Sequence, residues 1–341
     1  MKLSDRKKKI LQLVVDDYIS TAQPVSSKSL TEKYLTNISS ATVRSELAGL
    51  EEMGYLTQLH TSSGRVPSVE AYKLYVSELM DKNKLTKNEL NLIKDAFKGH
   101  ADNLEKVVQN AVKVISDLTE YTSVGFASHS EKDKIVKINI FRHKKNQALL
   151  LILTKNTLVR DKFIVIPEEM TDAQIDEASN LLSKLCVGRE LGEIIKLSDT
   201  VAEEFETYRD IFDSVIVAIE EYISAKDANV VMEGENKIFN HPEYNDSEKV
   251  KNFLSVVTSK NKLAGLLADG NDSIEVNIKI GGETGKEMPE DCSLVTASYS
   301  ASGVKIGTYG VIGPLRMDYQ KVVSVLEGVG KILEDILTNK D

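Results

Sequence analysis

Six residues near the N-terminus combine hydroxyl groups, a methyl group and a cation at the start of a predicted helix. They are Ser39, Ser40, Ala41, Thr42, Arg44 and Ser45. An arginine can pair with guanine edges or phosphate, a hydroxyl can bond to either, and an alanine methyl can touch thymine. Small side chains also allow a helix to approach a duplex closely. These residue types predict a helix whose first turn contacts DNA.

A second group of candidate DNA contacts lies shortly after the first. It consists of His60, Thr61, Ser62, Ser63, Gly64 and Arg65. We expect Gly64 to give backbone freedom, the serines to suit phosphate, and Arg65 to suit the minor groove or the DNA backbone. Lys7 and Lys28 are candidates for supporting phosphate contacts. An ordinary hairpin can carry the same residue types, so the surrounding elements must decide whether this one contacts DNA.

The elements that must position these groups are three helices and a hairpin. Apolar spacing predicts helices over about 4–20, 26–34 and 40–53, with Ser26 and either Ser39 or Ser40 as N-caps. Val43, Leu47 and Leu50 form one stripe of the third helix, and Gly54 suits a left-handed end. Two short strands then surround the tip at 61–65. Three helices followed by a hairpin predict a winged helix, although the third helix alone fits an ordinary capped helix equally well.

The other residues with chemical potential do not form a recognisable catalytic pattern. The stretch "IGGETGKEM" departs from a phosphate-binding loop at Ile280 and Glu287, and "GTYGVIG" has the wrong glycine spacing for a dinucleotide site. The five histidines lack metal-ligand spacing, and neither Cys186 nor Cys292 has a neighbouring histidine. We therefore expect no catalytic residue, no cofactor and no metal.

Composition and charge favour a helix-rich globular protein with a basic N-terminal end. The 341 residues are 41% hydrophobic and carry a net charge of −9, a length typical of roughly two or three domains. Residues 1–67 hold nine Lys and Arg against seven Asp and Glu, whereas the remainder holds 34 against 45. The chain shows neither a signal peptide nor a membrane-spanning run, which predicts a cytoplasmic protein without a membrane partner.

The rest of the chain alternates between helical and strand-like segments. Ser68 should cap a fourth helix, Thr86 and Glu89 form a capping box, and 103–121 has a broad apolar face. Three closely linked strands in "KIVKINIFRH", "QALLLILT" and "TLVRDKFIVI" predict an antiparallel meander, followed by helices over 171–185 and 201–223. Later strands lie in "SIEVNIKI", "CSLVTASYS" and "VKIGTYGVIG", before a final helix from Asp318.

Several of these stretches resemble the HrcA family of bacterial heat-inducible transcription repressors. The resemblance rests on "SSATVRSELAGLEEMGYL", "HTSSGRVPSVEAYKLYV", "GENKIFNHPEYND", "CSLVTASY" and "GVIGPLRMDYQKVVSVLE", which are collinear and span almost the whole chain. One departure is Ser40, where many members carry proline. The resemblance implies an α+β multidomain protein: a winged helix-turn-helix domain at 1–80, a GAF-like α/β domain at 85–127 and 229–341, and an inserted α+β dimerising domain at 128–228 with a three-stranded antiparallel sheet.

The resemblance also implies a function and partners. The expected protein is a homodimeric repressor that binds double-stranded DNA at the inverted-repeat CIRCE operator of the groE and dnaK operons, with a GroEL-type chaperonin keeping it active until heat stress. A two-fold dimer suits an inverted repeat because the two share their symmetry. The alternative is a winged-helix regulator controlled by a small molecule in the GAF-like domain, near Arg316 and Asp318. Against it, Arg316 can simply pair with an acid beside a glycine-shaped turn.

Overall fold

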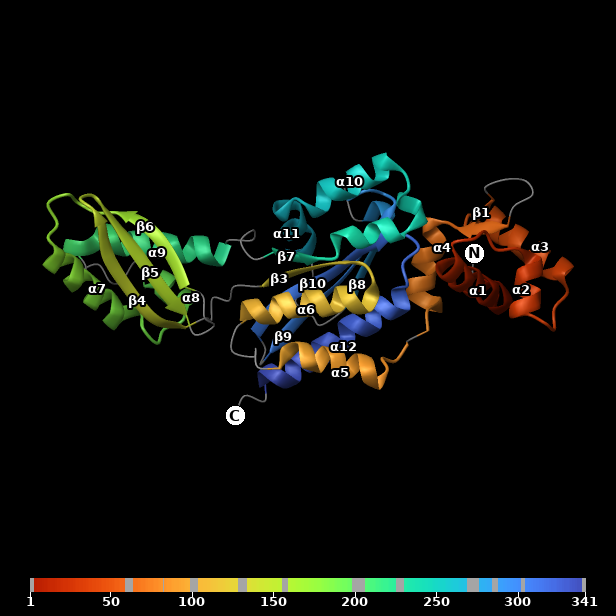
Figure 1. Ribbon diagram of the computed structural model, residues 1–341, viewed down its shortest axis with the longest axis horizontal. Helices are drawn as coiled ribbons and strands as arrows, with labels where there is room; N and C mark the ends of the chain where they lie inside the picture. Colours follow the sequence, from red (N-terminus) through yellow and green to blue (C-terminus); the bar gives the residue numbers. More distant parts are fainter. Residues whose placement is uncertain are drawn as a thin grey trace.

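The computed structural model describes most of the chain in three parts that follow one another along its longest axis (Figure 1). We name these parts the N-terminal unit (3–81), the central body (83–127 and 230–338) and the inserted unit (134–224). The described residues are 3–58, 64–81, 83–98, 104–127, 134–154, 159–197, 206–224, 230–268, 276–283, 288–301 and 304–338.

The N-terminal unit contains helices packed beside a two-stranded antiparallel ribbon. Its elements are α1 (Asp5–Thr21), α2 (Ser27–Lys33), α3 (Ser40–Glu52), β1 (Leu56–Gln58), β2 (Arg65–Pro67) and α4 (Val69–Leu74), which continues as a π-helical turn, Tyr75–Leu79. Serine side chains cap the helices by accepting backbone N–H groups: Ser4, Ser26, Ser39 and Ser68. The predicted caps and the helix order of this unit are therefore confirmed.

The central body is a five-stranded antiparallel sheet covered by helices on both faces (Figure 1). The strands β3 (Thr122–Ala127), β7 (Val230–Glu233), β8 (Val276–Ile280), β9 (Cys292–Ala301) and β10 (Val304–Pro314) take the order β7-β3-β10-β9-β8. On one side lie α5 (Lys87–Phe97), α6 (Leu104–Thr119) and α12 (Tyr319–Thr338), and on the other α10 (Ser247–Val257) and α11 (Lys260–Ala268). Along β9, Val295 and Tyr299 join one buried cluster while Leu294 joins the other, because alternate side chains point to opposite faces.

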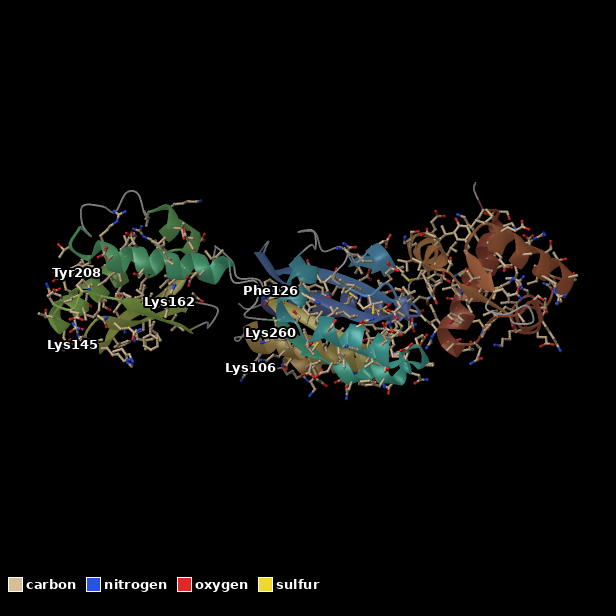
Figure 2. All side chains as sticks on the ribbon, turned by 90° about the horizontal axis from the view of Figure 1, so that it is seen from above. Lys106, Phe126, Lys145, Lys162, Tyr208 and Lys260 are labelled. Atoms are coloured by element: carbon tan, nitrogen blue, oxygen red, sulfur yellow. The ribbon has the colours of Figure 1, made fainter. Side chains whose placement is uncertain are left out.

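The inserted unit has its own sheet and its own buried cluster. It comprises β4 (Ile135–Lys144), β5 (Gln147–Thr154), β6 (Val159–Val165), α7 (Asp172–Cys186), α8 (Leu191–Lys196) and α9 (Arg209–Ser224), with antiparallel strand order β4-β5-β6. In the sequence the inserted unit follows β3 and precedes β7, and these two strands are hydrogen-bonded neighbours in the central sheet. Figure 2 shows the separation, with Lys145, Lys162 and Tyr208 in this unit and Lys106, Phe126 and Lys260 in the central body.

Two details of the inserted unit differ from the sequence-based expectation. The first five residues of the helix expected over 201–223 lie outside the described residues, and in the described part a 3-10 turn at Glu206–Tyr208 precedes the α-helix that begins at Arg209. Tyr208 is buried there and its hydroxyl donates to Glu177 Oε2 at 2.7 Å, so a tertiary contact accompanies the tighter turn. Helix α8 was not expected, since six residues are too few to show a clear helical period.

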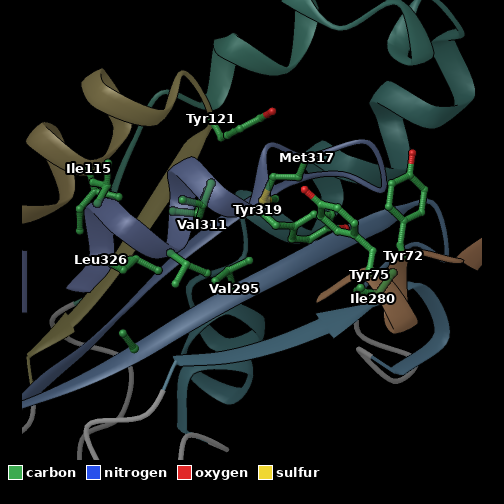
Figure 3. Packing of buried hydrophobic residues seen from close by; sticks show 14 of the residues in the cluster. Tyr72, Tyr75, Ile115, Tyr121, Ile280, Val295, Val311, Met317, Tyr319 and Leu326 are labelled. Atoms are coloured by element: carbon green, nitrogen blue, oxygen red, sulfur yellow. The ribbon is translucent and has the colours of Figure 1, made fainter. Parts of the chain in front are cut away.

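The N-terminal unit and the central body share one continuous core. Tyr72 and Tyr75, from α4 and the turn that follows it, belong to the same buried cluster as Ile280, Met317 and Tyr319 (Figure 3). The rings of Tyr72 and Tyr319 have their centroids 6.1 Å apart. None of the described helices combines the length and apolar character needed to cross a membrane.

Candidate nucleic-acid interface

The first turn of α3 presents polar groups outward while its opposite face is fixed in the core. Val43, Leu47 and Leu50 are at most 1% exposed. Ser39 caps the helix by accepting the N–H of Thr42 at 3.1 Å, and its hydroxyl also lies 2.9 Å from the Thr42 hydroxyl. The remaining predicted groups of this turn are exposed: Ser40, Ala41, Arg44 and Ser45. The buried stripe therefore determines which side chains can meet an external partner.

Ser40 also connects two helices of the unit. Its hydroxyl donates to the Ser27 hydroxyl at 3.2 Å, and Ser27 is buried at the start of α2. The Ser40 oxygen keeps acceptor capacity after making this bond, because a hydroxyl has two lone pairs. A phosphate oxygen cannot use that capacity, since it is itself an acceptor. Ser40 consequently serves first to hold α3 against α2.

The four predicted cationic contacts are in different electrostatic surroundings. Arg44 is exposed, and no carboxylate among the described residues pairs with it. Lys28, whose side chain is 80% exposed, lies 3.8 Å from Glu32 in a weak surface pair. Lys7 Nζ lies 2.8 Å from Glu46 Oε2, and Arg65 Nη2 lies 2.8 Å from Glu51 Oε2. Arg44 and Lys28 are therefore available to an incoming anion, whereas Lys7 and Arg65 are already paired.

Lys7 supplies a physical reason for the glycine in the middle of α3. A Cβ added to Gly49 would lie 2.6 Å from Lys7 Nζ. Glycine at this position lets the lysine cross the helix and reach Glu46, which joins α1 to α3. The pair lies beneath the exposed surface of the helix, since Lys7 is only 23% exposed. Gly49, for which sequence alone offers no explanation, makes room for this contact.

The β1–β2 ribbon is attached to the segment between α1 and α2. Arg65 and Val25 exchange both backbone hydrogen bonds, at 2.9 and 2.8 Å. A Cβ on Gly64 would lie 2.6 Å from the Val25 backbone, so close approach explains this glycine. The expectation that Gly64 serves backbone freedom is thus replaced by a packing reason. His60, Thr61, Ser62 and Ser63 lie outside the described residues.

Sequence reasoning overlooked the acids that organise this surface. Glu46 binds Lys7, and Glu51 binds the Arg65 guanidinium. Lys7 and Glu46 are 39 residues apart in the chain, and Arg65 and Glu51 are 14 apart. No helical or strand period links residues at such separations. Only the packing of α1 and β2 against α3 brings these pairs together.

The segment considered for a small-molecule site has its charged groups engaged internally. Arg316 Nε lies 2.5 Å from Glu243 Oε1, which agrees with the expectation that Arg316 pairs with an acid. Asp318 Oδ1 accepts the N–H of Lys321 at 3.0 Å at the start of α12. A Cβ on Gly313 would lie 2.9 Å from both Tyr121 and Met317, so this turn is tightly packed. An open groove of about 400 Å³ lies elsewhere, between α4 and β8, where Lys73 pairs with Glu70 and Glu283.

Within the described part of the chain, nothing resembles a metal centre or an activated nucleophile. No group of three or more His, Cys, Asp and Glu residues there is arranged to hold a metal ion. Burial raises the pKa of both Cys186 and Cys292 to about 12, which disfavours the reactive thiolate. Residues 284–287, which belong to the stretch "IGGETGKEM", lie outside the described residues.

Comparison with known proteins places the chain among transcription regulators. The family model described as "HrcA protein C terminal domain" matches residues 105–323. A protein of Ruminiclostridium cellulolyticum named heat-inducible transcription repressor HrcA is 39% identical, covering 99% of this chain and 98% of that protein. A protein of the same name from Pelotomaculum thermopropionicum is 36% identical over 99% and 97% of the two chains. That name describes a regulator rather than an enzyme.

The chain belongs to the HrcA family, as the family model and these relatives show. A solved structure described as a hypothetical protein at 2.2 Å resolution is also similar, with a TM-score of 0.65 and 22% identity over the whole of both chains. That likeness concerns the fold. The three-part arrangement therefore also occurs in a chain of quite different sequence.

Proposed function

We propose that this protein is a transcription repressor that binds double-stranded operator DNA through the first turn of α3. The observation that carries this proposal is the selective exposure of that turn: Arg44 is exposed, whereas Lys7 and Arg65 are engaged with acids. Because no carboxylate among the described residues pairs with Arg44, it can reach a base edge without first breaking an ion pair of that kind. The family relatives, named as heat-inducible transcription repressors, support the same assignment.

In this proposal residues 1–80 act as a winged helix-turn-helix domain with α3 in the major groove. The base-reading and nearby backbone contacts come from the exposed first turn: Ser39, Ser40, Ala41, Thr42, Arg44 and Ser45. The wing, 60–65, lies along the DNA backbone or minor groove, and Lys28 contributes a phosphate contact. Lys7 and Arg65 contribute chiefly by holding α1 and β2 against α3, and each contacts DNA only if it leaves its acid.

We further propose that residues 128–228 form the dimerising domain and that its exposed sheet face is the dimer contact. Phe141, Leu149 and Phe163 stand in register across β4, β5 and β6. Phe141 and Phe163 are 50% and 51% exposed, and Val165 nearby is 74% exposed. An apolar row on an exposed sheet is typical of an interaction surface. A two-fold dimer places two copies of α3 on the halves of an inverted repeat.

Residues 85–127 and 229–341 would form a GAF-like domain that connects the DNA-binding and dimerising parts. We assign this domain a structural role rather than ligand sensing, because Arg316 and Asp318 are used in internal contacts. The operator in this account is the CIRCE inverted repeat of the groE and dnaK operons, read in the cytoplasm. A GroEL-type chaperonin maintains the active repressor, and heat relieves repression by withdrawing that chaperonin.

Transcription in vitro from a promoter carrying the CIRCE repeat tests this function. The protein should lower transcript yield from that promoter and leave a promoter with a scrambled repeat unchanged. Brief heating should relieve repression, and added chaperonin should restore it. Equal transcript yield from both promoters at every protein concentration would overturn the repressor assignment, whereas repression indifferent to chaperonin would overturn only the proposed mode of heat control.

A further inference from the structure

A single arginine of the central body reaches across to the first helix of the N-terminal unit. Arg316 follows β10, and its Nη1 donates to the Ile19 carbonyl oxygen at 2.6 Å, across 297 residues of sequence. Its Nε and Nη2 donate to the two oxygens of Glu243, at 2.5 and 3.3 Å. The Arg316 side chain is only 12% exposed. One guanidinium therefore joins two parts of the molecule in a fixed geometry.

The end of α1 is chemically suited to receive this cation. Ile19 lies in the last turn, where the backbone carbonyls lack N–H donors within the helix. That turn contains no basic residue. Asp16 shortly before it adds negative charge, whereas the adjacent Asp17 is paired with Lys33 at 2.8 Å. The carbonyl end of a helix also carries partial negative charge. Arg316 thus supplies from the central body the positive group that α1 does not provide itself.

Glu243 holds Arg316 in the orientation needed for this contact. Burial alone would raise the pKa of Glu243, but the hydrogen bonds and charge of Arg316 keep it below its ordinary value. A carboxylate bound through both oxygens fixes the plane of a guanidinium, which leaves Nη1 aimed at Ile19. Glu243 belongs to a 3-10 turn, Pro242–Tyr244, within the central body.

A neighbouring set of hydrogen bonds connects the same two parts. The Tyr75 hydroxyl donates to Asp16 Oδ1 at 2.6 Å and accepts from Gln320 Nε2 at 2.7 Å. The other contacts across this joint include the apolar side chains of Tyr72 and Met317. Apolar packing tolerates small rotations, whereas charged hydrogen bonds are directional. Lys73 also pairs with Glu283 across this joint, at 3.4 Å, but its side chain is 33% exposed and its ammonium is a point charge. Arg316 is more deeply buried and makes three hydrogen bonds in a fixed geometry, so it is the contact best able to define one relative orientation.

We infer that Arg316, held by Glu243, is a positioning residue that locks the N-terminal unit to the central body at the end of α1. The consequence for DNA rests on the proposed repressor function: in a dimer, this orientation sets the distance between the two copies of α3. The lock then determines which spacing of operator half-sites the protein accepts.

Distance measurements between spin labels test the lock without DNA. Labels at Glu52→Cys and Lys251→Cys report on α3 and α10, and both positions are exposed. Mixing with unlabelled protein limits the signal to distances within one chain. The buried Cys186 and Cys292 should label poorly. We expect a narrow distance distribution in the otherwise native chain and a clearly broader one after Arg316→Ala.

Three further variants separate positioning from general destabilisation. Arg316→Lys retains the charge without the planar fork and should broaden the distribution less than Arg316→Ala. Glu243→Gln keeps the side-chain volume and should also broaden it, which preserves the test if Arg316→Ala does not fold. The matched control is Arg142→Ala, because Arg142 binds Asp172 and the Lys145 carbonyl wholly inside the inserted unit. An unchanged distribution in folded Arg316→Ala, or equal broadening in Arg142→Ala, would overturn the lock.

Operator titrations supply the second readout. With half-sites at native spacing, Arg316→Ala should lose on the order of tenfold in affinity, a size typical of coupling between distant sites. Its affinity for a single half-site should stay unchanged, and its discrimination against altered spacings should fall. If Arg316→Ala discriminated against altered half-site spacings as strongly as the native chain does, the proposed consequence for DNA would be contradicted. If the native chain bound no inverted repeat, the repressor function would fail, and the distance measurement would still decide the lock.

Discussion

At the scale of single residues, the structure separates cations that are paired within the N-terminal unit from those that are exposed to an external partner. Residue type and position alone predicted four cationic DNA contacts: Lys7, Lys28, Arg44 and Arg65. Glu46 and Glu51 hold Lys7 and Arg65, whereas Arg44 is exposed. Type and position thus identified the helix, but only tertiary contacts distinguish the function of one cation from another.

Arg44→Ala should remove sequence-specific binding. If Arg44 contacts a base, its loss should cost about 1–3 kcal/mol of operator affinity and leave binding to a scrambled duplex much less affected. The comparison variant is Lys28→Ala, which should weaken binding to both duplexes by a similar factor. It should also reduce the slope of log affinity against log salt concentration by about one. Anisotropy titrations at several salt concentrations measure both effects. The reverse pattern in the two variants would contradict the assignment of Arg44 to a base and Lys28 to phosphate.

Gly49→Ala should show that this glycine serves Lys7. In a Lys7→Ala background the substitution should raise the free energy of unfolding by about 1 kcal/mol, because alanine favours the helix. With Lys7 present the gain should be smaller, since the new Cβ displaces Lys7 Nζ from its place beside Glu46. Denaturant unfolding of the four chains in this cycle gives the coupling. Equal gains in both backgrounds would refute this explanation of Gly49.

At the scale of helices and strands, local sequence predicted most of what the structure contains. Ser26 and Thr86 lie at helix starts where capping reasoning placed them, and Val43 and Leu47 face the core as their spacing indicated. These signals are local, since a cap or a stripe involves residues a few positions apart. The pairing of β3 with β10 joins segments nearly two hundred residues apart, as the 187-residue separation of Ser123 and Gly310 shows. Such pairings leave no periodic signal in the chain.

Phe163→Glu should weaken self-association. A charge placed on the exposed apolar row of the inserted unit would be buried without a partner in the proposed dimer. We expect the dissociation constant of the dimer to rise by at least about tenfold, with unchanged folding of the monomer. Leu92→Glu is the control, because Leu92 is similarly exposed, at 55%, on α5 of the central body. Sedimentation equilibrium measures the dimer dissociation constant of both variants. Matching effects of the two substitutions would argue against this face as the dimer contact.

Glu89 links α5 to α12 and gives a pH-dependent contribution to stability. The hydrogen bond from Lys321, followed by that from the Thr86 backbone, lowers the pKa of Glu89 from 4.5 to about 2. A carboxylate with a lowered folded-state pKa stabilises above pH 4.5 and loses its contribution as the pH falls toward 2. Since this pair is partly exposed, solvent screening limits the contribution to about 1 kcal/mol or less.

The corresponding comparison is native protein against Glu89→Gln, which keeps an acceptor for the capping box. The native chain should be more stable at pH 7, and the difference should shrink steadily between pH 4.5 and the lowest pH at which both remain folded. Thermal unfolding at matched salt measures the difference. A stability difference that grew with acidification would show that the sign of this argument is wrong.

At the scale of the whole molecule, the inserted unit lies at one end and the candidate DNA-binding unit at the other, with the central body between them (Figure 1). A dimer formed at one end positions two DNA-binding units only if the intervening joints are rigid. The shared core around Tyr72 and Met317 and the Arg316 contact to Ile19 provide such rigidity at one joint. The sequence could suggest the three parts through family resemblance. It could not predict their orientation, because that depends on contacts between distant segments.

The most direct test of the central claim is equilibrium binding to three duplexes at one salt concentration near physiological. The first carries the intact inverted repeat, the second has one half-site scrambled, and the third has both scrambled. We predict tightest binding to the intact repeat, weaker binding to the single half-site, and at least about a thousandfold weaker binding to the fully scrambled duplex. Equal affinity for all three would contradict the conclusion that α3 reads an operator sequence.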